Sequence, residues 1–231
     1  MVSSASADQP APRSRKGVQT RARLIEAARE VFERDGFLNA RISDIAATAS
    51  LSQGSFYHYF ESKEQIFREV AEAQERRLTE PDGEAGEARE ELSPREVIGR
   101  ANRRYFERYL DAARLMGVIE QVSRFDQDVS VTRNARHHHY HEEMADSIRR
   151  LQRHGLVDPD LDPEVTAAAL GSMTYRFPEL WFVQGLFDCD FDEGVEQFTR
   201  VFVRALGLED DAARSGEAPA ASAKVAPARR S

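Results

Sequence analysis

The chain has 231 residues, a formal net charge of −8 and a single cysteine, Cys189, which excludes an internal disulfide framework and a cysteine-rich zinc site. No apolar run approaches the roughly 20 residues of a membrane span, and the polar N-terminus lacks the apolar stretch of a signal peptide. We therefore expect a cytoplasmic protein without a membrane partner.

The negative charge is unevenly distributed along the chain. Residues 1–70 carry ten Lys and Arg against nine Asp and Glu, whereas residues 71–231 carry 22 against 31. Within residues 11–29 there are six basic residues and one acid, Glu26. Because binding to nucleic acid needs positive charge only where phosphates lie, the overall acidity does not exclude it for the first part of the chain.

Apolar periodicity predicts an all-α protein with two helical domains, since no stretch alternates with period two. Residues 1–17 have the Ser-, Ala- and Pro-rich composition of a disordered basic arm, and residues 208–231 that of a disordered tail. Between them we expect a helix-turn-helix domain at 18–78, an acidic linker loop at 79–93 and a second helical domain at 94–207.

The first domain is predicted from its caps and apolar stripes. A helix at 20–34 ends at Asp35-Gly36, a short helix follows at 42–48, and a tight turn at 49–51 leads to a third helix at 53–60 capped by Ser52. Ser62 caps a fourth helix. Three short helices closed by a longer one are typical of a helix-turn-helix domain.

The second domain is predicted to contain helices at 94–111, 112–125, 129–154, 163–185 and 191–206. From Val165 to Phe187 the only charged residues are Arg176 and Glu179, and apolar residues occur all round the helix at 163–185, so it must be covered on more than one side. We expect it to pack with 191–206 against a second copy of the chain, the alternative being a helix buried within one monomer. Pro178 removes a hydrogen bond and is expected to bend this helix, either opening space for a ligand or following the curvature of the core.

The third helix carries the most specific pattern, Gln53-Gly54-Ser55-Phe56-Tyr57-His58-Tyr59-Phe60. Phe56 and Phe60, four residues apart, must enter the core, which turns Gly54, Ser55, Tyr57 and His58 outward and leaves Tyr59 on the flank. Small residues allow close approach to base edges, Gln53 can pair with adenine, and Tyr and His can reach phosphates. This face is therefore predicted to bind DNA.

Residues 24–70, with the segments LIEAAREVFERDGF, ISDIA and LSQGSFYHYFESKEQIF, resemble the DNA-binding domain of TetR (tetracycline-repressor-like) transcriptional regulators. The resemblance implies base or groove contacts from Gln53, Gly54, Ser55 and Tyr57, and phosphate contacts from His58, Tyr59 and Lys63, with Ser43 also facing DNA. It further implies a homodimer that binds a palindromic operator as double-stranded DNA, and a small-molecule effector in the domain at 94–207, which would also dimerise.

Two positions depart from the family pattern. Ala40 and Arg41 stand where threonines usually precede the second helix, so a hydroxyl N-cap is lost and a cation is gained. Ser50 stands in the turn where glycine is usual, although serine is less at ease with a positive φ. Both bear on the contact geometry and neither on the fold.

The effector site is less clearly indicated by the sequence. In the helix at 129–154 one face carries Ser130, Asn134, His137, His141, Met144, Ile148 and Leu151, polar at one end and apolar at the other. Bulky apolar side chains elsewhere are either core or cavity lining. Candidate ligand-binding residues are Tyr105, Tyr109, Met116, Phe125, His137, His141, Met144, Phe177 and Trp181, and they favour an apolar effector.

The run His137-His138-His139-Tyr140-His141 allows a metal site, pocket lining or plain structural histidines, with a titrating interface as a further reading. No HExxH, glycine-rich phosphate loop or G-x-S-x-G motif is present, so we predict neither a cofactor nor a bound metal, and no enzymatic activity. The expected function is a ligand-responsive repressor. A transcriptional activator and a constitutive architectural DNA-binding protein are the alternatives.

Overall fold

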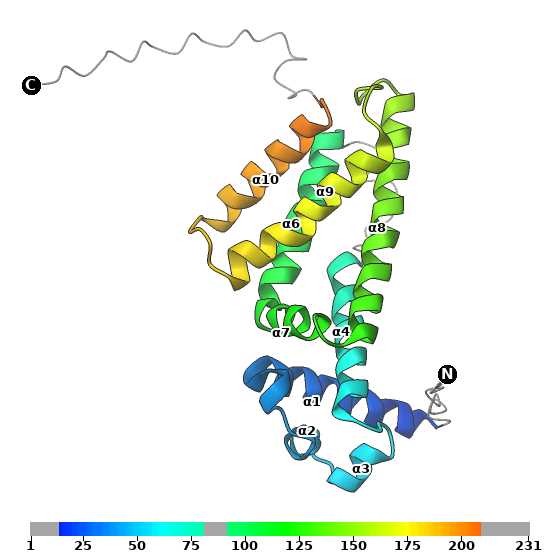
Figure 1. The fold of residues 1–231 in the computed structure, drawn as a ribbon, viewed down its shortest axis with the longest axis vertical. Coiled ribbons are helices and arrows are strands. Elements are labelled where there is room, and N and C mark those ends of the chain that lie inside the picture. The colour runs from blue at the N-terminus through cyan, green and yellow to red at the C-terminus, as the bar shows by residue number, and fades with distance from the viewer. Residues whose placement is uncertain (1–13, 81–91, 209–231) are drawn as a thin grey trace, which may run out of the picture.

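The computed structural model describes residues 14–80 and 92–208 (Figure 1), and every regular element within these two ranges is a helix. The predicted all-α class is confirmed. Within these ranges no helix is both long and apolar enough to cross a bilayer. Most of the expected N-terminal arm, the centre of the expected linker and nearly all of the expected tail lie outside the described residues.

The N-terminal helices form a small unit, here called the head, at one end of the molecule (Figure 1). It consists of α1 (Arg15–Asn39), α2 (Ile42–Thr48), α3 (Gln53–Tyr57) and the first turns of α4 (Lys63–Thr79). Its core is rich in fully buried aromatic rings, and Phe32 meets Phe67 edge to face with 4.9 Å between ring centroids. Such pairs add specific geometry to the burial of apolar area.

Two helix ends in the head differ from the sequence-based expectation. The first helix begins at Arg15, inside the segment expected to be an arm, because the Ser14 hydroxyl caps it by accepting a 3.1 Å hydrogen bond from the Gly17 amide. Its predicted stop is present, since Gly36 has a φ of +72° and non-helical geometry. The third helix ends at Tyr57, and residues 58–59 continue as a turn.

The remaining helices form a larger unit, here called the body. It contains α6 (Pro94–Asp111), α7 (Ala113–Ser123), α8 (Gln127–Arg153), α9 (Pro163–Pro178), the π-helix η1 (Glu179–Val183) and α10 (Phe191–Ala205). Ser93 and Glu96 form a capping box at the start of α6. The long α8 packs along α9, α10 packs along α6, and α4 runs from the head into the body (Figure 1).

Pro178 ends the regular part of α9, and the chain continues as the π-helix η1. A proline lacks the amide hydrogen that an α-helix needs, so the predicted irregularity falls where the sequence placed it. Phe177 and Trp181 on either side pack against the fully buried ring of Phe106. The irregularity therefore lies in the aromatic core, and Phe177, Pro178 and Trp181 line neither of the two hollows described below.

Candidate functional site

The side chains of α3 and the turn after it divide into a buried aromatic side and an exposed polar side. Phe56 and Phe60 are both fully buried, as predicted. Gln53, Gly54, Tyr57 and His58 are exposed, with Tyr57 about half accessible. These four residues, here called the α3 face, present an amide, a bare backbone, a phenol and an imidazole at the tip of the head. Groups of this kind reach base edges and phosphates.

Gly54 is not required by the protein's own packing. A Cβ added there would meet only the Ser52 hydroxyl, at the ordinary distance of 3.8 Å. Glycine in a helix costs about 0.5–1 kcal/mol relative to alanine. A glycine that costs stability without solving a steric problem inside the protein indicates close approach by a molecule outside it.

The other predicted contacts on α2 and α3 vary in accessibility. Ser43 is exposed on α2 and its hydroxyl lies 3.3 Å from a carboxylate oxygen of Asp44. Ser55 and Tyr59 are half-buried. Tyr59 packs against the core of the head and meets the His58 ring edge to face, so only its outer part remains for a phosphate.

Lys63 is engaged within the head. Its ammonium donates to the carbonyl oxygens of Phe37 at 2.7 Å and Ala40 at 3.1 Å, and it lies 4.6 Å from the centre of the Phe37 ring. The side chain therefore ties the start of α4 to the segment that joins α1 to α2. A phosphate would have to replace these acceptors, so the predicted phosphate contact of Lys63 competes with a structural role.

Both departures from the family pattern have local structural consequences. Arg41 is the N-cap residue of α2 and makes no side-chain capping bond. Ser50 has a φ of +54° and is the one non-glycine residue with positive φ within the described ranges. The turn between α2 and α3 therefore needs the left-handed conformation that glycine adopts most easily.

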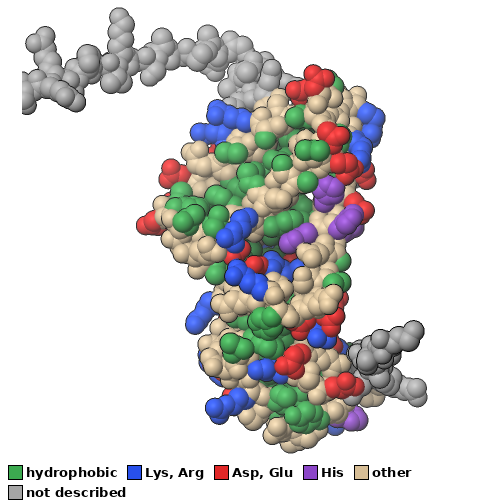
Figure 2. All heavy atoms as spheres, viewed as in Figure 1, with side chains coloured by type: hydrophobic (Ala, Val, Ile, Leu, Met, Phe, Trp, Pro, Cys, Tyr) green, Lys and Arg blue, Asp and Glu red, His purple; other side chains and the backbone are tan. Residues whose placement is uncertain are grey.

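The histidine run lies on the body along α8 (Figure 2). The ring of His137 stacks on that of Tyr175 with 3.7 Å between centroids, and burial, with the Arg133 cation adding to it, lowers the pKa of His137 to about 4. The His141 Nε2 atom lies 3.0 Å from the Glu164 carbonyl oxygen. Within 14–80 and 92–208 no three His, Cys, Asp or Glu side chains are grouped as metal ligands.

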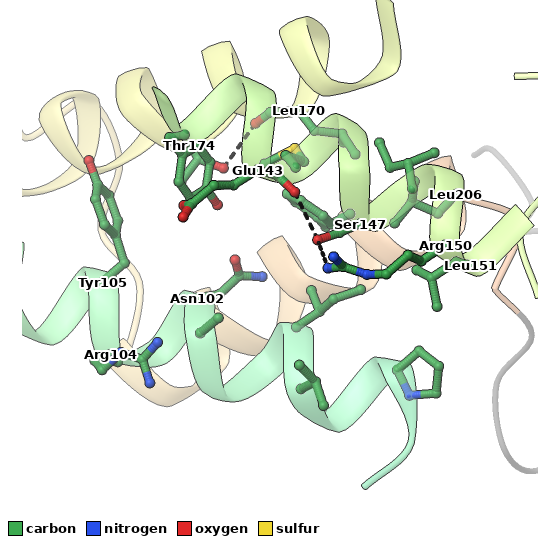
Figure 3. Close-up of a pocket in the computed structure, with 18 of the residues that line it drawn as sticks. Asn102, Arg104, Tyr105, Glu143, Ser147, Arg150, Leu151, Leu170, Thr174 and Leu206 are labelled. Carbon is green, nitrogen blue, oxygen red and sulfur yellow. Dashed lines mark hydrogen bonds between the residues drawn. The ribbon is translucent and has the colours of Figure 1, made fainter. Parts of the chain in front are cut away.

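A cavity of about 560 Å³ lies within the body, in the size range of small-molecule sites (Figure 3). Helices α6, α8, α9 and α10 and the end of α4 line it. Asn102 of α6 and Thr174 of α9 are buried polar residues of its wall, to which Arg104, Glu143, Ser147, Arg150 and His154 add further polar and charged groups. The apolar lining residues include Val97, Ile98, Met144, Ile148, Leu151, Leu170, Phe202 and Leu206.

Two of the nine residues predicted to bind a ligand line this cavity, Tyr105 and Met144. The other seven lie elsewhere. Tyr109 and Met116 are buried in the apolar cluster that the body shares with the head, Phe177 and Trp181 pack in the aromatic core of the body, and Phe125 is exposed, while His137 and His141 face Tyr175 and Glu164. Many of the large aromatic residues of the body fill its core instead. Helical spacing places Val97, Ile98, Ala101, Asn102 and Tyr105 on one face of α6, but it does not specify which helices that face meets.

Charged side chains join α4 to the body beneath the cavity. Arg133 of α8 pairs with Glu75 of α4 at 3.0 Å and also with Glu120 of α7. Burial raises the pKa of Glu75, although the Arg133 cation opposes this shift. Arg68 pairs with Asp126, the N-cap residue of α8, at 3.2 Å. Any change in the body that moves α8 therefore acts on the helix that carries the head.

Comparison with known proteins agrees with this arrangement. Residues 24–70 match the family described as "Bacterial regulatory proteins, tetR family". The chain is 30% identical over 187 residues to the uncharacterized HTH-type transcriptional regulator YdgC of Bacillus subtilis (strain 168), covering 75% of this chain and 86% of that protein. It is 28% identical over 160 residues to the HTH-type transcriptional regulator UidR of Escherichia coli (strain K12), covering 68% and 78%.

The fold is also found among solved structures. Salmonella enterica GusR superposes with a TM-score of 0.63 at 21% identity, over 82% of this chain and 96% of that one. A protein of Mesorhizobium loti described as a putative TetR-family transcriptional regulator gives a TM-score of 0.64 at 18% identity, over 84% and 98%. The head, its α3 face and the relatives agree, and the chain belongs to the TetR family of DNA-binding transcriptional regulators.

Proposed function

We propose that the protein is a repressor that binds a palindromic operator as a homodimer and is released when a small molecule occupies the body. The observation that carries DNA recognition is the α3 face, which offers Gln53, Tyr57 and His58 around the flat surface of Gly54. Base contacts are assigned to Gln53, Gly54, Ser55 and Tyr57. Ser43, His58 and Tyr59 are assigned to the DNA backbone and the groove edges.

Dimerisation is assigned to the predicted helices at 163–185 and 191–206. Apolar residues remain exposed on both, with Val165 of α9 68% exposed and Val201 of α10 56% exposed. Ala168, Ala169 and Ser172 continue the exposed surface of α9 with small side chains. Two heads related by a two-fold axis would read two half-sites about one helical turn, or a multiple of it, apart.

Ligand release is supported by the cavity and by its position. The end of α4, with Leu78 and Thr79, forms part of the cavity wall, and the other end of the same helix begins at Lys63 in the head. A ligand that displaces the end of α4 would change the orientation of the head. Repression by covering a promoter needs no further domain.

Selection of bound DNA from a random pool by the full chain tests this function. The expected product is a two-fold symmetric sequence bound at least about 10³-fold more tightly than random DNA. Binding without sequence preference would favour an architectural protein instead. A reporter gene placed behind the selected sequence then separates repression, in which the regulator lowers expression, from activation.

A further inference from the structure

The cavity of the body is continued by a smaller polar hollow of about 320 Å³. Its wall includes Arg76 and Thr79 of α4 and Arg136, His139, Tyr140 and Glu143 of α8. Thr79, Tyr140 and Glu143 line both hollows. A single elongated ligand is thus offered an apolar compartment at one end and a polar compartment at the other.

Among the described residues, Arg136 has a buried side-chain nitrogen that makes no hydrogen bond. Its Nη2 donates to the Thr79 hydroxyl and lies 3.4 Å from the Arg76 carbonyl oxygen. Its Nε is buried and has no hydrogen-bond partner among the described residues. A buried donor without an acceptor is costly, and the groups that satisfy a guanidinium best are carboxylates and phosphates.

Neighbouring arginines differ from Arg136 in this respect. Arg133, one turn earlier on α8, pairs with Glu75 and Glu120, and Arg76 pairs with Glu72. No carboxylate of residues 14–80 or 92–208 forms an ion pair with Arg136. Within the described residues the guanidinium therefore lies in the wall of the polar hollow without a carboxylate in direct contact, although the Arg136 cation is near enough to Glu75 to help lower the pKa of that carboxyl.

We propose that the two hollows together bind an amphipathic carboxylate, with its head on Arg136 and its apolar chain between Ile98, Met144 and Leu170. This proposal rests on the ligand-responsive function proposed above and names the class of ligand. Ile148, Leu151 and Phe202 extend the apolar compartment beyond these three residues. A neutral or cationic head would leave the guanidinium without a counter-charge.

Two carboxylate residues line the polar hollow, Glu80 and Glu143, and both are exposed. Glu143 also lines the larger cavity; it repels an anionic head, but its carboxylate lies 3.4 Å from the His139 imidazole. Because Glu143 is exposed, water and salt screen its charge more than they screen the charge of the half-buried Arg136. Removing the Glu143 charge should therefore raise the affinity for an anionic head, whereas removing the Arg136 charge should lower it.

Binding of a head group at Arg136 also reaches the DNA-binding end of the molecule. The Nη2 atom holds the last turn of α4 through Thr79 and Arg76. A carboxylate on the guanidinium competes with these two acceptors for the Nη2 hydrogens. The ligand thereby loosens the end of the helix that leads to the head.

Calorimetric titration of the full chain with decanoate, decanol and decyltrimethylammonium, each below its micelle concentration, tests the proposal. Decanoate is expected to bind at least about tenfold more tightly than the other two, because a charge-assisted hydrogen bond contributes about that much or more. Equal affinity for decanoate and decanol would overturn the proposal, and so would no binding by any of them.

Variants then locate the head group. Arg136→Gln should weaken decanoate binding about tenfold to a hundredfold and leave decanol within about twofold, with partial rescue by Arg136→Lys. Glu143→Gln should tighten decanoate binding. Arg153→Gln, on the same helix but in neither hollow, is the matched control, and thermal melts confirm that each variant is folded.

The principal rival position is Arg150, which lines the larger cavity at its other end and whose Nη2 donates to the Ser147 hydroxyl at 2.8 Å (Figure 3). If Arg150→Gln removes the preference for decanoate and Arg136→Gln does not, the proposed orientation is wrong. DNA release is measured separately. Binding through Arg136 without DNA release would contradict the proposed function and leave the proposed ligand class standing. Release of DNA by decanol alone would contradict the ligand class and leave the proposed function standing.

Discussion

The head and the body of this protein are both helical, but they use their interiors differently. In the head, fully buried Phe32, Phe56, Phe60 and Phe67 fill the space between four helices. In the body a cavity of about 560 Å³ and the buried pair of Arg133 and Glu75 interrupt the apolar core. A close-packed core should hold the exposed face of α3 in one conformation. A body that contains a cavity should allow its helices to shift more easily relative to one another.

A pair of truncations tests this contrast most strongly. Phe67→Ala should lower the free energy of unfolding by about 3–5 kcal/mol, because it removes a fully buried ring that contacts Phe32 and Phe37. Leu151→Ala, in the cavity wall, should cost only about 1–2 kcal/mol, since the side chain is only half-buried. Urea unfolding measures both, and equal costs would contradict the contrast.

The body should also be the more sensitive to acid. The pKa of His137 is lowered to about 4 by burial, so the folded body favours the neutral ring and loses stability as the pH falls from about 6.5 to 4. Between about pH 7 and pH 4.5, this residue should account for about 2–3 kcal/mol of lost stability. His137→Phe keeps a ring against Tyr175 and should show a correspondingly smaller loss. An identical loss in both proteins would exclude His137 as the source.

Gly54→Ala separates the stability of the head from its function. An added Cβ meets only the Ser52 hydroxyl at 3.8 Å, so the variant should be as stable as the original or about 0.5–1 kcal/mol more stable. Affinity for the selected operator should nevertheless fall at least about tenfold, because the methyl group stands between the helix and the base edges. Unchanged affinity would remove Gly54 from the contact surface.

The smallest expected effect concerns the turn between α2 and α3. Ser50 has a φ of +54°, so Ser50→Gly should raise the free energy of unfolding by about 0.5–1 kcal/mol. Ser52→Ala, two residues later, is the control of opposite sign, because its hydroxyl accepts the Ser55 amide hydrogen at 3.1 Å. Loss of stability in Ser50→Gly would show that the turn does not strain serine.

The structure of the head can be predicted from its sequence more completely than the structure of the body. In the head, Ser52, Gly36 and the pair Phe56 and Phe60 act over a few residues, so the caps, the stop and the exposed face of α3 follow from local rules. The cavity depends on how the faces of α6, α8 and α9 meet, which no local pattern specifies. Large rings such as Trp181 are suited by type to a ligand site, yet they pack against one another.

Lys63 and Arg136 show a second limit of sequence reasoning. A lysine at the start of α4 is a reasonable phosphate ligand by position, but its ammonium binds the carbonyls of Phe37 and Ala40. Arg136 lies in a helix with many arginines and has no distinguishing sequence signal. Only its surroundings, the Thr79 hydroxyl and the absence of a carboxylate partner among the described residues, set it apart.

We propose that the exposed face of α3 reads DNA sequence. The most direct test is the ratio of the affinities for the selected operator and for random DNA, measured at one salt concentration for the original chain and for Tyr57→Ala. Tyr57 is about half exposed, so its loss should leave the melting temperature nearly unchanged. We predict that the ratio falls about tenfold or more, because one good base contact contributes about 1–3 kcal/mol of discrimination. An unchanged ratio with an unchanged footprint would contradict the claim.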